Sequence, residues 1–231
     1  MLRLEGVEIA QGDFALAADF DVTPGRRTAV IGPSGAGKST LLGALGGFVP
    51  LRAGRVLWNA RDITHDAPGA RPMAMLFQDN NLFPHLSIAQ NAGLGVRPDL
   101  KLSAEDSARV AQALARVGLE GLEGRKPGEL SGGQQSRAAL ARVLVQDRPV
   151  VLLDEPFAAL GPALRREMLD LVRSLVEETG ATLLMVTHDP QDVRRMAEDV
   201  IFVEGGRAAA PQPAQALLED PPPALRAYLG V

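Results

Sequence analysis

The pattern of apolar and polar positions predicts short strands that alternate with helices along most of the chain. Uninterrupted apolar runs at residues 150–153 and 183–186 are typical of strands buried on both faces of a parallel sheet. Near the N-terminus, two strand-like stretches are followed by the turn-forming pair Pro24-Gly25. The strand candidates are residues 2–9, 14–22, 28–31, 55–58, 73–77, 150–153 and 183–186.

Helical patterns fill much of the chain between these strands. The segment from 87 to about 145 is mostly helical, and within it Ser103 and Asp106 have the spacing of a helix-start capping signal. No internal repeat or long linker divides the sequence. The pattern therefore predicts one α/β domain over residues 1–231, with a helical insertion at about 87–145. The individual helix candidates are residues 39–46, 135–145 and 162–179.

Composition narrows the classes of function. The net charge of -4 gives no overall positive field, so we expect no nucleic-acid partner. The absence of cysteine excludes disulfides, thiolate metal sites and a cysteine nucleophile. No apolar run approaches the roughly 20 residues that a membrane-spanning helix needs, and the N-terminus does not read as a signal peptide. We therefore expect a cytoplasmic chain whose membrane role, if any, comes through a partner.

A glycine-rich segment between a predicted strand and a predicted helix matches the phosphate-binding pattern G-x-x-x-x-G-K-[ST] in full. Its glycines let the backbone aim N–H groups at phosphate oxygens, and the following helix presents its positive end to the same anion. Lys38 adds a charge for the β- and γ-phosphates, and the Ser39 hydroxyl can bind Mg²⁺. The predicted ATP-binding residues are Gly32, Pro33, Ser34, Gly35, Ala36, Gly37, Lys38, Ser39 and Thr40.

Two carboxylates follow the apolar run 150–153. A strand end beside a phosphate-binding loop is where ligands sit in a doubly wound sheet. Acidic strand ends are common on solvated surfaces, but beside this loop they indicate chemistry. We predict that Asp154 holds Mg²⁺, directly or through water, and that Glu155 polarises the attacking water as a general base.

A second glycine-rich turn precedes a helix rich in Ala, Leu and Arg. Such a turn at a helix start is a second anion site. Two phosphate sites in one chain suggest that two copies meet head to tail across shared nucleotides. The predicted contacts to the partner's nucleotide are Ser131, Gly132, Gly133 and Gln134.

Together these segments resemble the ABC ATPases. The phosphate-binding loop, residues 130–134 and residues 152–156 match the Walker A, signature and Walker B motifs, in the order usual for that family. The resemblance implies a P-loop NTPase of α/β class, with an N-terminal antiparallel β subdomain and a helical signature subdomain inserted in a RecA-like core. It also implies a homodimer that binds and hydrolyses ATP with Mg²⁺.

Two further positions match marks of this family. Gln78, after the strand candidate 73–77, corresponds to the Q-loop glutamine, and His188, after 183–186, to the switch histidine. The resemblance implies that Gln78 touches Mg²⁺ and that His188 contacts the γ-phosphate. The implied catalytic set is Glu155, His188 and Gln78, and the implied metal set is Ser39, Gln78 and Asp154.

Residues 75–83, 89–95 and 98–102 resemble the ATPase subunits of bacterial thiamine importers. This resemblance implies import of a small solute, thiamine, through a separate integral membrane permease that a periplasmic or extracellular solute-binding protein serves. The ATPase would then be peripheral, on the cytoplasmic face of the inner membrane, with residues 78–86 cradling a short permease helix. The alternatives are an importer of another solute, an exporter, a soluble ABC ATPase, and a P-loop kinase or GTPase, which leaves 130–134 without a role.

The sequence departs from the family pattern at two places. Gly161 stands where the family usually has an aspartate, which puts the rate and coupling of hydrolysis in question but not nucleotide binding. The N-terminal sheet lacks a tyrosine at the position that usually stacks on adenine. Phe14 is the remaining aromatic candidate there, although a phenylalanine that packs in the core is the simpler interpretation.

Overall fold

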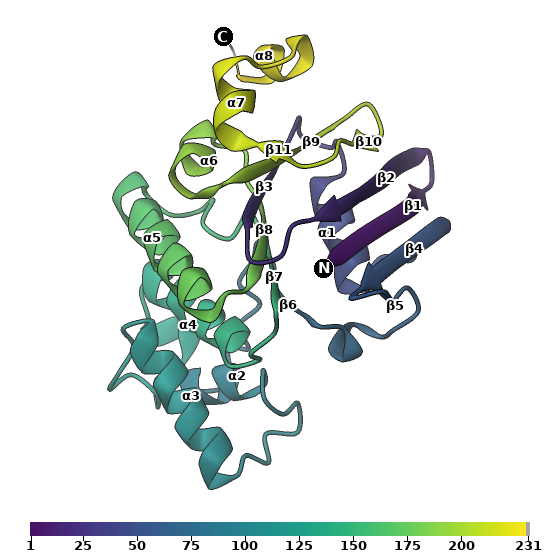
Figure 1. Cartoon of the computed structure of the whole chain (residues 1–231). Helices are drawn as coiled ribbons and strands as arrows, with labels where there is room; N and C mark the ends of the chain where they lie inside the picture. The colour runs from purple at the N-terminus through teal and green to yellow at the C-terminus, as the bar shows by residue number, and fades with distance from the viewer. Residues whose placement is uncertain (230–231) are drawn as a thin grey trace.

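The computed structural model describes residues 1–229. Figure 1 shows a sheet flanked by helices, with the last two helices at the end of the molecule opposite α3. The strands are β1 (Leu2–Gln11), β2 (Phe14–Val22), β3 (Arg27–Ile31), β4 (Ala53–Trp58), β5 (Arg61–Asp62), β6 (Met73–Leu76), β7 (Val150–Asp154), β8 (Thr182–Val186), β9 (Asp199–Glu204), β10 (Arg207–Ala208) and β11 (Gln212–Pro213). The α-helices are α1 (Lys38–Gly46), α2 (Ile88–Gly93), α3 (Ala104–Arg116), α4 (Gly132–Leu144), α5 (Pro162–Thr179), α6 (Pro190–Met196), α7 (Ala214–Glu219) and α8 (Pro223–Leu229).

One continuous sheet has two halves that differ in strand direction. In the N-terminal half, β1 pairs antiparallel with β2 and with β4, and β4 pairs with β5. In the other half the strands run parallel in the order β9-β3-β8-β7-β6. The short strand β10 joins the halves, because it pairs with β9 on one side and with β2 on the other. The predicted α/β fold with an antiparallel N-terminal part is confirmed.

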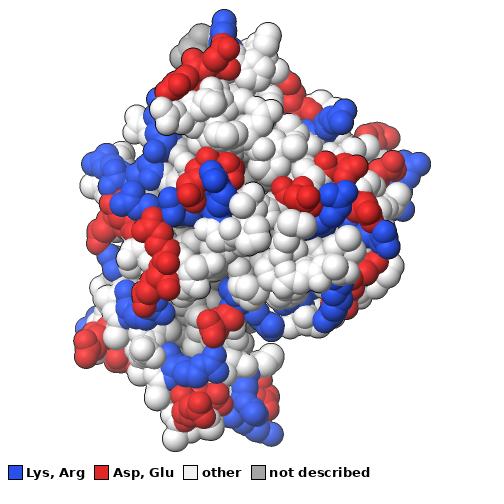
Figure 2. Space-filling model, in the orientation of Figure 1, with Lys and Arg blue, Asp and Glu red and all other residues white. Residues whose placement is uncertain are grey.

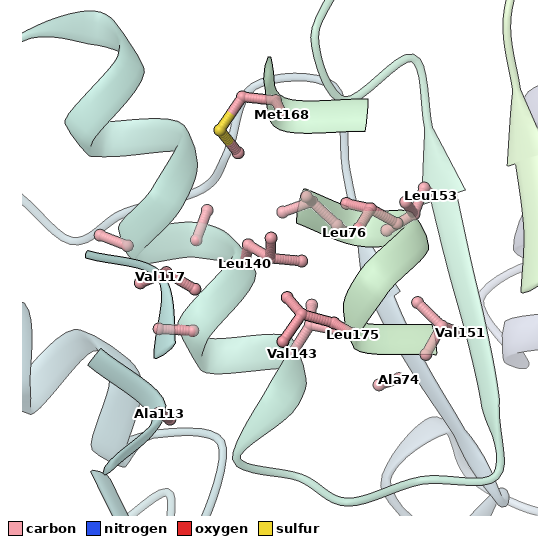
Figure 3. Close-up of a cluster of buried hydrophobic side chains, with 14 of the residues drawn as sticks. Ala74, Leu76, Ala113, Val117, Leu140, Val143, Val151, Leu153, Met168 and Leu175 are labelled. Atoms are coloured by element: carbon pink, nitrogen blue, oxygen red, sulfur yellow. The ribbon is translucent and has the colours of Figure 1, made fainter. Parts of the chain in front are cut away.

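Apolar packing on both faces of the parallel strands explains their uninterrupted apolar runs. Along β7, Val150 and Leu152 belong to the core around α1, whereas Val151 and Leu153 belong to the core shared with α4 and α5. Figure 3 shows Leu140 of α4 among the side chains of this second core. The helices α1 and α4 therefore cover opposite faces of the sheet. That α2–α4 form a separate subdomain stays a prediction.

Side-chain caps set the starts of the helices in this region. Ser103 accepts a hydrogen bond from the Asp106 amide and starts α3, as predicted. The helix predicted at 135–145 starts earlier, at Gly132, so its predicted start was wrong. The reason is a capping box in which Ser131 accepts from the Gln134 amide and the Gln134 side chain accepts from the Ser131 amide.

The C-terminal third contains elements that the sequence pattern did not predict, including β9, the short strands β10 and β11, α6 and α7. Most of these are short. Ala29 and Ile31 of β3 pack against Leu217 of α7 and Leu225 of α8. The last two helices are thus anchored on the strand that leads into the phosphate-binding loop.

Acidic and basic side chains are interspersed over the face shown in Figure 2. A group of basic side chains lies on the side of α5 and α6, where Arg166 and Arg194 line a shared hollow. Within residues 1–229, no helix combines the length and the apolar character that crossing a membrane requires.

Candidate active site

The phosphate-binding loop leaves β3 and enters α1 in a compact conformation. Gly32 has φ 150°, and a Cβ there would lie 2.0 Å from the carbonyl oxygen of Val203, so no other residue fits. Lys38 is buried, and its Nζ donates to the carbonyl oxygens of Gly32 and Pro33, each at 2.9 Å. Burial lowers the pKa of Lys38, while the carboxylates of Glu155 and Asp154 act in the opposite direction. The loop thus folds around the ammonium group that is predicted to meet phosphate.

Asp154 ends β7 beside the start of α1. The Ser39 hydroxyl donates to its Oδ1 at 2.8 Å. Asp154 is 8% exposed, and this burial raises the pKa of its carboxyl group, with the Ser39 hydrogen bond opposing the shift and the neighbouring Glu155 adding to it. The buried Asp154 carboxylate thus lies beside the Ser39 hydroxyl and near the Lys38 ammonium group. Together these groups can bind a cation and phosphate.

Glu155 takes an unusual backbone conformation directly after β7. Its φ is 45°, which non-glycine residues rarely adopt, and its amide donates to the Val186 carbonyl at 3.2 Å. His188, two residues beyond β8, places Nδ1 3.3 Å from Glu155 Oε2. Strained backbone of this kind persists where surrounding structure holds it, and it clusters at functional sites. The structure thus brings Glu155 and His188 together.

A polar network supports the His188 loop from the side of α5 and α6. Thr187 donates to Asp192 Oδ2 at 2.6 Å, and Arg165 donates to the same oxygen from Nε at 3.1 Å. Arg165 also lies 3.6 Å from Asp189. Thr187 and Asp192 are buried. This network ties the loop to the first turns of α5, the helix that begins after Gly161.

The remaining predicted residues lie apart from this constellation. Gln78 is exposed after β6, and in residues 1–229 no hydrogen bond joins its side chain to the other site residues. Ser131–Gln134 open α4, and in the same range no hydrogen bond connects them to the phosphate-binding loop. The structure therefore brings Lys38, Ser39, Asp154, Glu155 and His188 together but leaves the second glycine-rich turn outside the group.

Helix α4 contacts the segment after Gln78 mainly through Arg142, and the Asn80 side chain also donates to the Ser136 hydroxyl at 3.4 Å. Arg142 of α4 donates from Nη1 to the Asn81 carbonyl at 2.7 Å and from Nη2 to the Asn80 carbonyl at 2.6 Å. Both asparagines have positive φ, 57° for Asn80 and 47° for Asn81. The guanidinium therefore attaches an unusual backbone turn to α4, the helix that Ser131 caps.

Two aromatic residues lie near the phosphate-binding loop. The sequence pattern left open whether Phe14 meets adenine or the core, and it gave no indication of Tyr228. Phe14 is half-buried, packs on the core around α1, and comes so close to Gly37 that a Cβ there would lie 2.4 Å from its ring. Tyr228 of α8 donates to the His188 carbonyl at 3.2 Å. No local sequence signal connects a tyrosine near the C-terminus with this loop.

The backbone conformation does not require glycine at position 161, where the family usually has an aspartate. Gly161 precedes α5 with φ -63° and ψ 157°, which any residue can adopt, and its helix has no side-chain cap. No described atom lies within 4 Å of the position a Cβ would take. The backbone therefore leaves room for the aspartate that is absent.

Comparison with known proteins agrees with the geometry of the site. The sequence model of the ABC transporter family matches residues 16–158. The chain belongs to this family and is an ATP-hydrolysing subunit built on the ATP-binding cassette fold.

Two relatives are similar to this chain over nearly its whole length. The chain is 62% identical to "Thiamine import ATP-binding protein ThiQ" of Ruegeria sp. (strain TM1040), over 100% of both chains. It is 51% identical to the protein of the same name from Brucella suis, over 99% of this chain and 95% of the relative.

Solved structures of ATP-binding cassettes superpose well. The ADP conformation of one cassette has a TM-score of 0.86 and 26% identity, covering 100% of this chain and 99% of that one. A dimeric post-hydrolysis state bound to ADP and phosphate has a TM-score of 0.79 and 29% identity, covering 93% and 99%.

The buried carboxylate of Asp154 leads to a stability prediction. Its raised pKa means that holding the charge costs folding free energy above the folded-state pKa, and that this cost vanishes below the unfolded value near pH 4. We expect Asp154→Asn to raise the Tm of the nucleotide-free protein at pH 7, by about 2–4 °C for each kcal/mol relieved. The gain should shrink as the pH is lowered toward about 4.

Thermal unfolding across pH values checks this result, with Asp62→Asn as the control. Hydrogen bonds from Thr64 lower the pKa of Asp62, so that substitution should leave Tm unchanged or lower it. A lower Tm for Asp154→Asn at pH 7 would contradict the interpretation.

Proposed function

We propose that this chain is the ATP-hydrolysing subunit of a thiamine importer and that it drives a separate membrane permease. The arrangement of Lys38, Ser39, Asp154, Glu155 and His188 at one edge of the parallel sheet is the observation that carries the ATPase chemistry. Full-length similarity to proteins named for thiamine import supports the choice of solute.

The roles of these residues follow from their positions. Lys38 exchanges its two carbonyl partners for the β- and γ-phosphates, and the loop amides around it bind the remaining phosphate oxygens. Glu155 accepts a proton from the attacking water. His188, held beside Glu155, donates to the γ-phosphate and keeps the carboxylate oriented.

The chain offers a donor set that suits Mg²⁺. Hydroxyl, carboxylate and amide oxygens come from Ser39, Asp154 and Gln78, and Mg²⁺ prefers such oxygens together with phosphate. The Ser39 and Asp154 oxygens are 2.8 Å apart and the Asp154 carboxyl group is buried, so the two side chains would together hold a divalent cation. When bound, Mg²⁺ neutralises the charge that develops on the phosphates.

A head-to-tail homodimer accounts for the second glycine-rich turn. Gly132 lies at an exposed helix start, and no described atom is within 4 Å of where its Cβ would be. Contacts within this chain therefore give no reason for glycine there, although glycine weakens a helix. Close approach of a nucleotide held by the partner supplies the reason. Each ATP would lie between Lys38 of one copy and Ser131–Gln134 of the other.

An aromatic surface beside Gln78 is suited to a permease segment. Phe48, 52% exposed, stands edge-on to Phe77 with ring centroids 5.1 Å apart. Phe83 is 47% exposed and comes shortly after Gln78. Exposed aromatic side chains are typical of protein interfaces. We propose that residues 78–86 contact the permease, which sets the ATPase on the cytoplasmic face of the inner membrane, while a solute-binding protein acts from the other side.

ATP hydrolysis by the chain assembled with its permease in lipid vesicles tests this function. Thiamine-loaded binding protein should stimulate hydrolysis, and the unloaded protein should stimulate less. Hydrolysis without any response to thiamine would agree with the ABC ATPase assignment but contradict thiamine as the solute. An assembly that does not hydrolyse ATP would contradict the proposed site.

A further inference from the structure

The terminal helix α8 brings a hydroxyl group to the loop that carries His188. The Tyr228 hydroxyl donates to the His188 carbonyl oxygen at 3.2 Å, across 40 positions of sequence. The amide of Gly32, the first residue of the phosphate-binding loop, is near enough to lower the pKa of Tyr228, against the raising effect of burial. The Tyr228 side chain thus contacts the loop that is proposed to sense phosphate.

The position of this hydroxyl is fixed by apolar packing. Leu225, one turn before Tyr228, is fully buried in a cluster that includes Ile31 of β3 and Val193 of α6. The Tyr228 ring lies beside Phe202 of β9, with centroids 6.3 Å apart and an interplanar angle of 52°. Because α8 rests on the strand and helix that flank the site, the hydroxyl is placed by the core and is not left to a free chain end.

The His188 loop is held from two directions. On one side, the Thr187 hydroxyl is bonded to Asp192, which Arg165 of α5 also contacts. On the other side, the Tyr228 hydroxyl donates a hydrogen bond to the His188 carbonyl oxygen. The His188 side chain itself is half exposed, and its Nδ1 lies 3.3 Å from Glu155 Oε2. The placement of the imidazole therefore depends on how firmly its backbone is held.

We propose that Tyr228 is a positioning residue for ATP hydrolysis, which holds the His188 loop so that the imidazole stays within reach of Glu155 and the γ-phosphate. This inference rests on the role proposed for His188. Burial raises the pKa of Tyr228, which keeps its hydroxyl protonated and able to donate throughout the neutral range. The tyrosine touches neither nucleotide nor attacking water in this scheme and acts through the backbone of the loop.

The test is Tyr228→Phe in the assembled transporter, since this change removes one hydroxyl and keeps the ring against Phe202. We expect kcat to fall about threefold to tenfold, the effect of one lost hydrogen bond on the reacting geometry, with KM for ATP unchanged. The variant Leu225→Ala, which loosens the seat of α8, should lower kcat at least as much and should also lower Tm.

A double-mutant cycle distinguishes positioning from a general structural role. If Tyr228 acts through the imidazole, Tyr228→Phe should cause no further loss in a His188→Ala background. An additive loss there would overturn the inference, as would an unchanged or raised kcat in the single variant. An active native assembly with an unaffected Tyr228→Phe would overturn this inference alone. A native assembly without hydrolysis would overturn the proposed function, and this inference with it.

Discussion

Replacement of Glu155 by glutamine should stop turnover while the protein still binds ATP and dimerises. The amide keeps the size of the side chain and its place beside His188, but it cannot accept the proton of the attacking water. A general base contributes about 10²–10⁴-fold to a rate, so hydrolysis should fall within that range. Because ATP then remains bound between two copies, size-exclusion chromatography should show an ATP-dependent dimer.

An exposed acid far from the site provides the control for this variant. Glu120→Gln, in the loop after α3, should hydrolyse ATP at the native rate and show no ATP-trapped dimer. Native turnover by Glu155→Gln would instead mean that another group serves as the base.

A large side chain at Ser131 should abolish hydrolysis without preventing ATP binding by the single chain. Ser131 lies outside the Lys38–Asp154 constellation, and an arginine at this exposed position would fill the space where the partner's phosphates must enter. We expect Ser131→Arg to bind ATP, to remain monomeric and to lose essentially all turnover. Binding can be followed by equilibrium dialysis and assembly by light scattering.

The chain offers a matched control at Ser103. Ser103 caps α3 with the same reciprocal capping box that Ser131 forms at α4. Both arginine variants lose a cap of about 0.5–2 kcal/mol, so their unfolding temperatures should fall alike. Only Ser131→Arg should lose the dimer. Equal turnover in the two variants would favour a P-loop enzyme that works as a monomer.

Local patterns predicted which residues meet at this edge of the sheet, because each of the contributing segments has a short sequence pattern of its own. Buried parallel strands need apolar residues on both faces, and β7 and β8 show this as continuous runs. The residues after each run then fall at the same edge of the sheet. The hydrogen bond of Ser39 to Asp154 follows from this geometry, although 115 positions separate the two residues.

Other features depend on contacts that no local pattern records. The start of α4 was misplaced because Ser131 and Gln134 cap each other and stabilise a turn that contains two glycines. Tyr228 was missed because its contact with the His188 loop depends on where α8 packs, which apolar contacts with β3 and α6 decide. Residues 230–231 lie outside the described chain.

The hydrogen bonds from Arg142 to the carbonyl oxygens of Asn80 and Asn81 couple α4 mechanically to the segment after Gln78. A guanidinium with two backbone acceptors, at 2.6 and 2.7 Å, resists sliding and twisting more than a single bond does. If residues 78–86 contact the permease as proposed, we expect this segment and α4 to move as one rigid unit joined by Arg142. A displacement of residues 78–86 would then be transmitted through α4 to the nucleotide held by the partner.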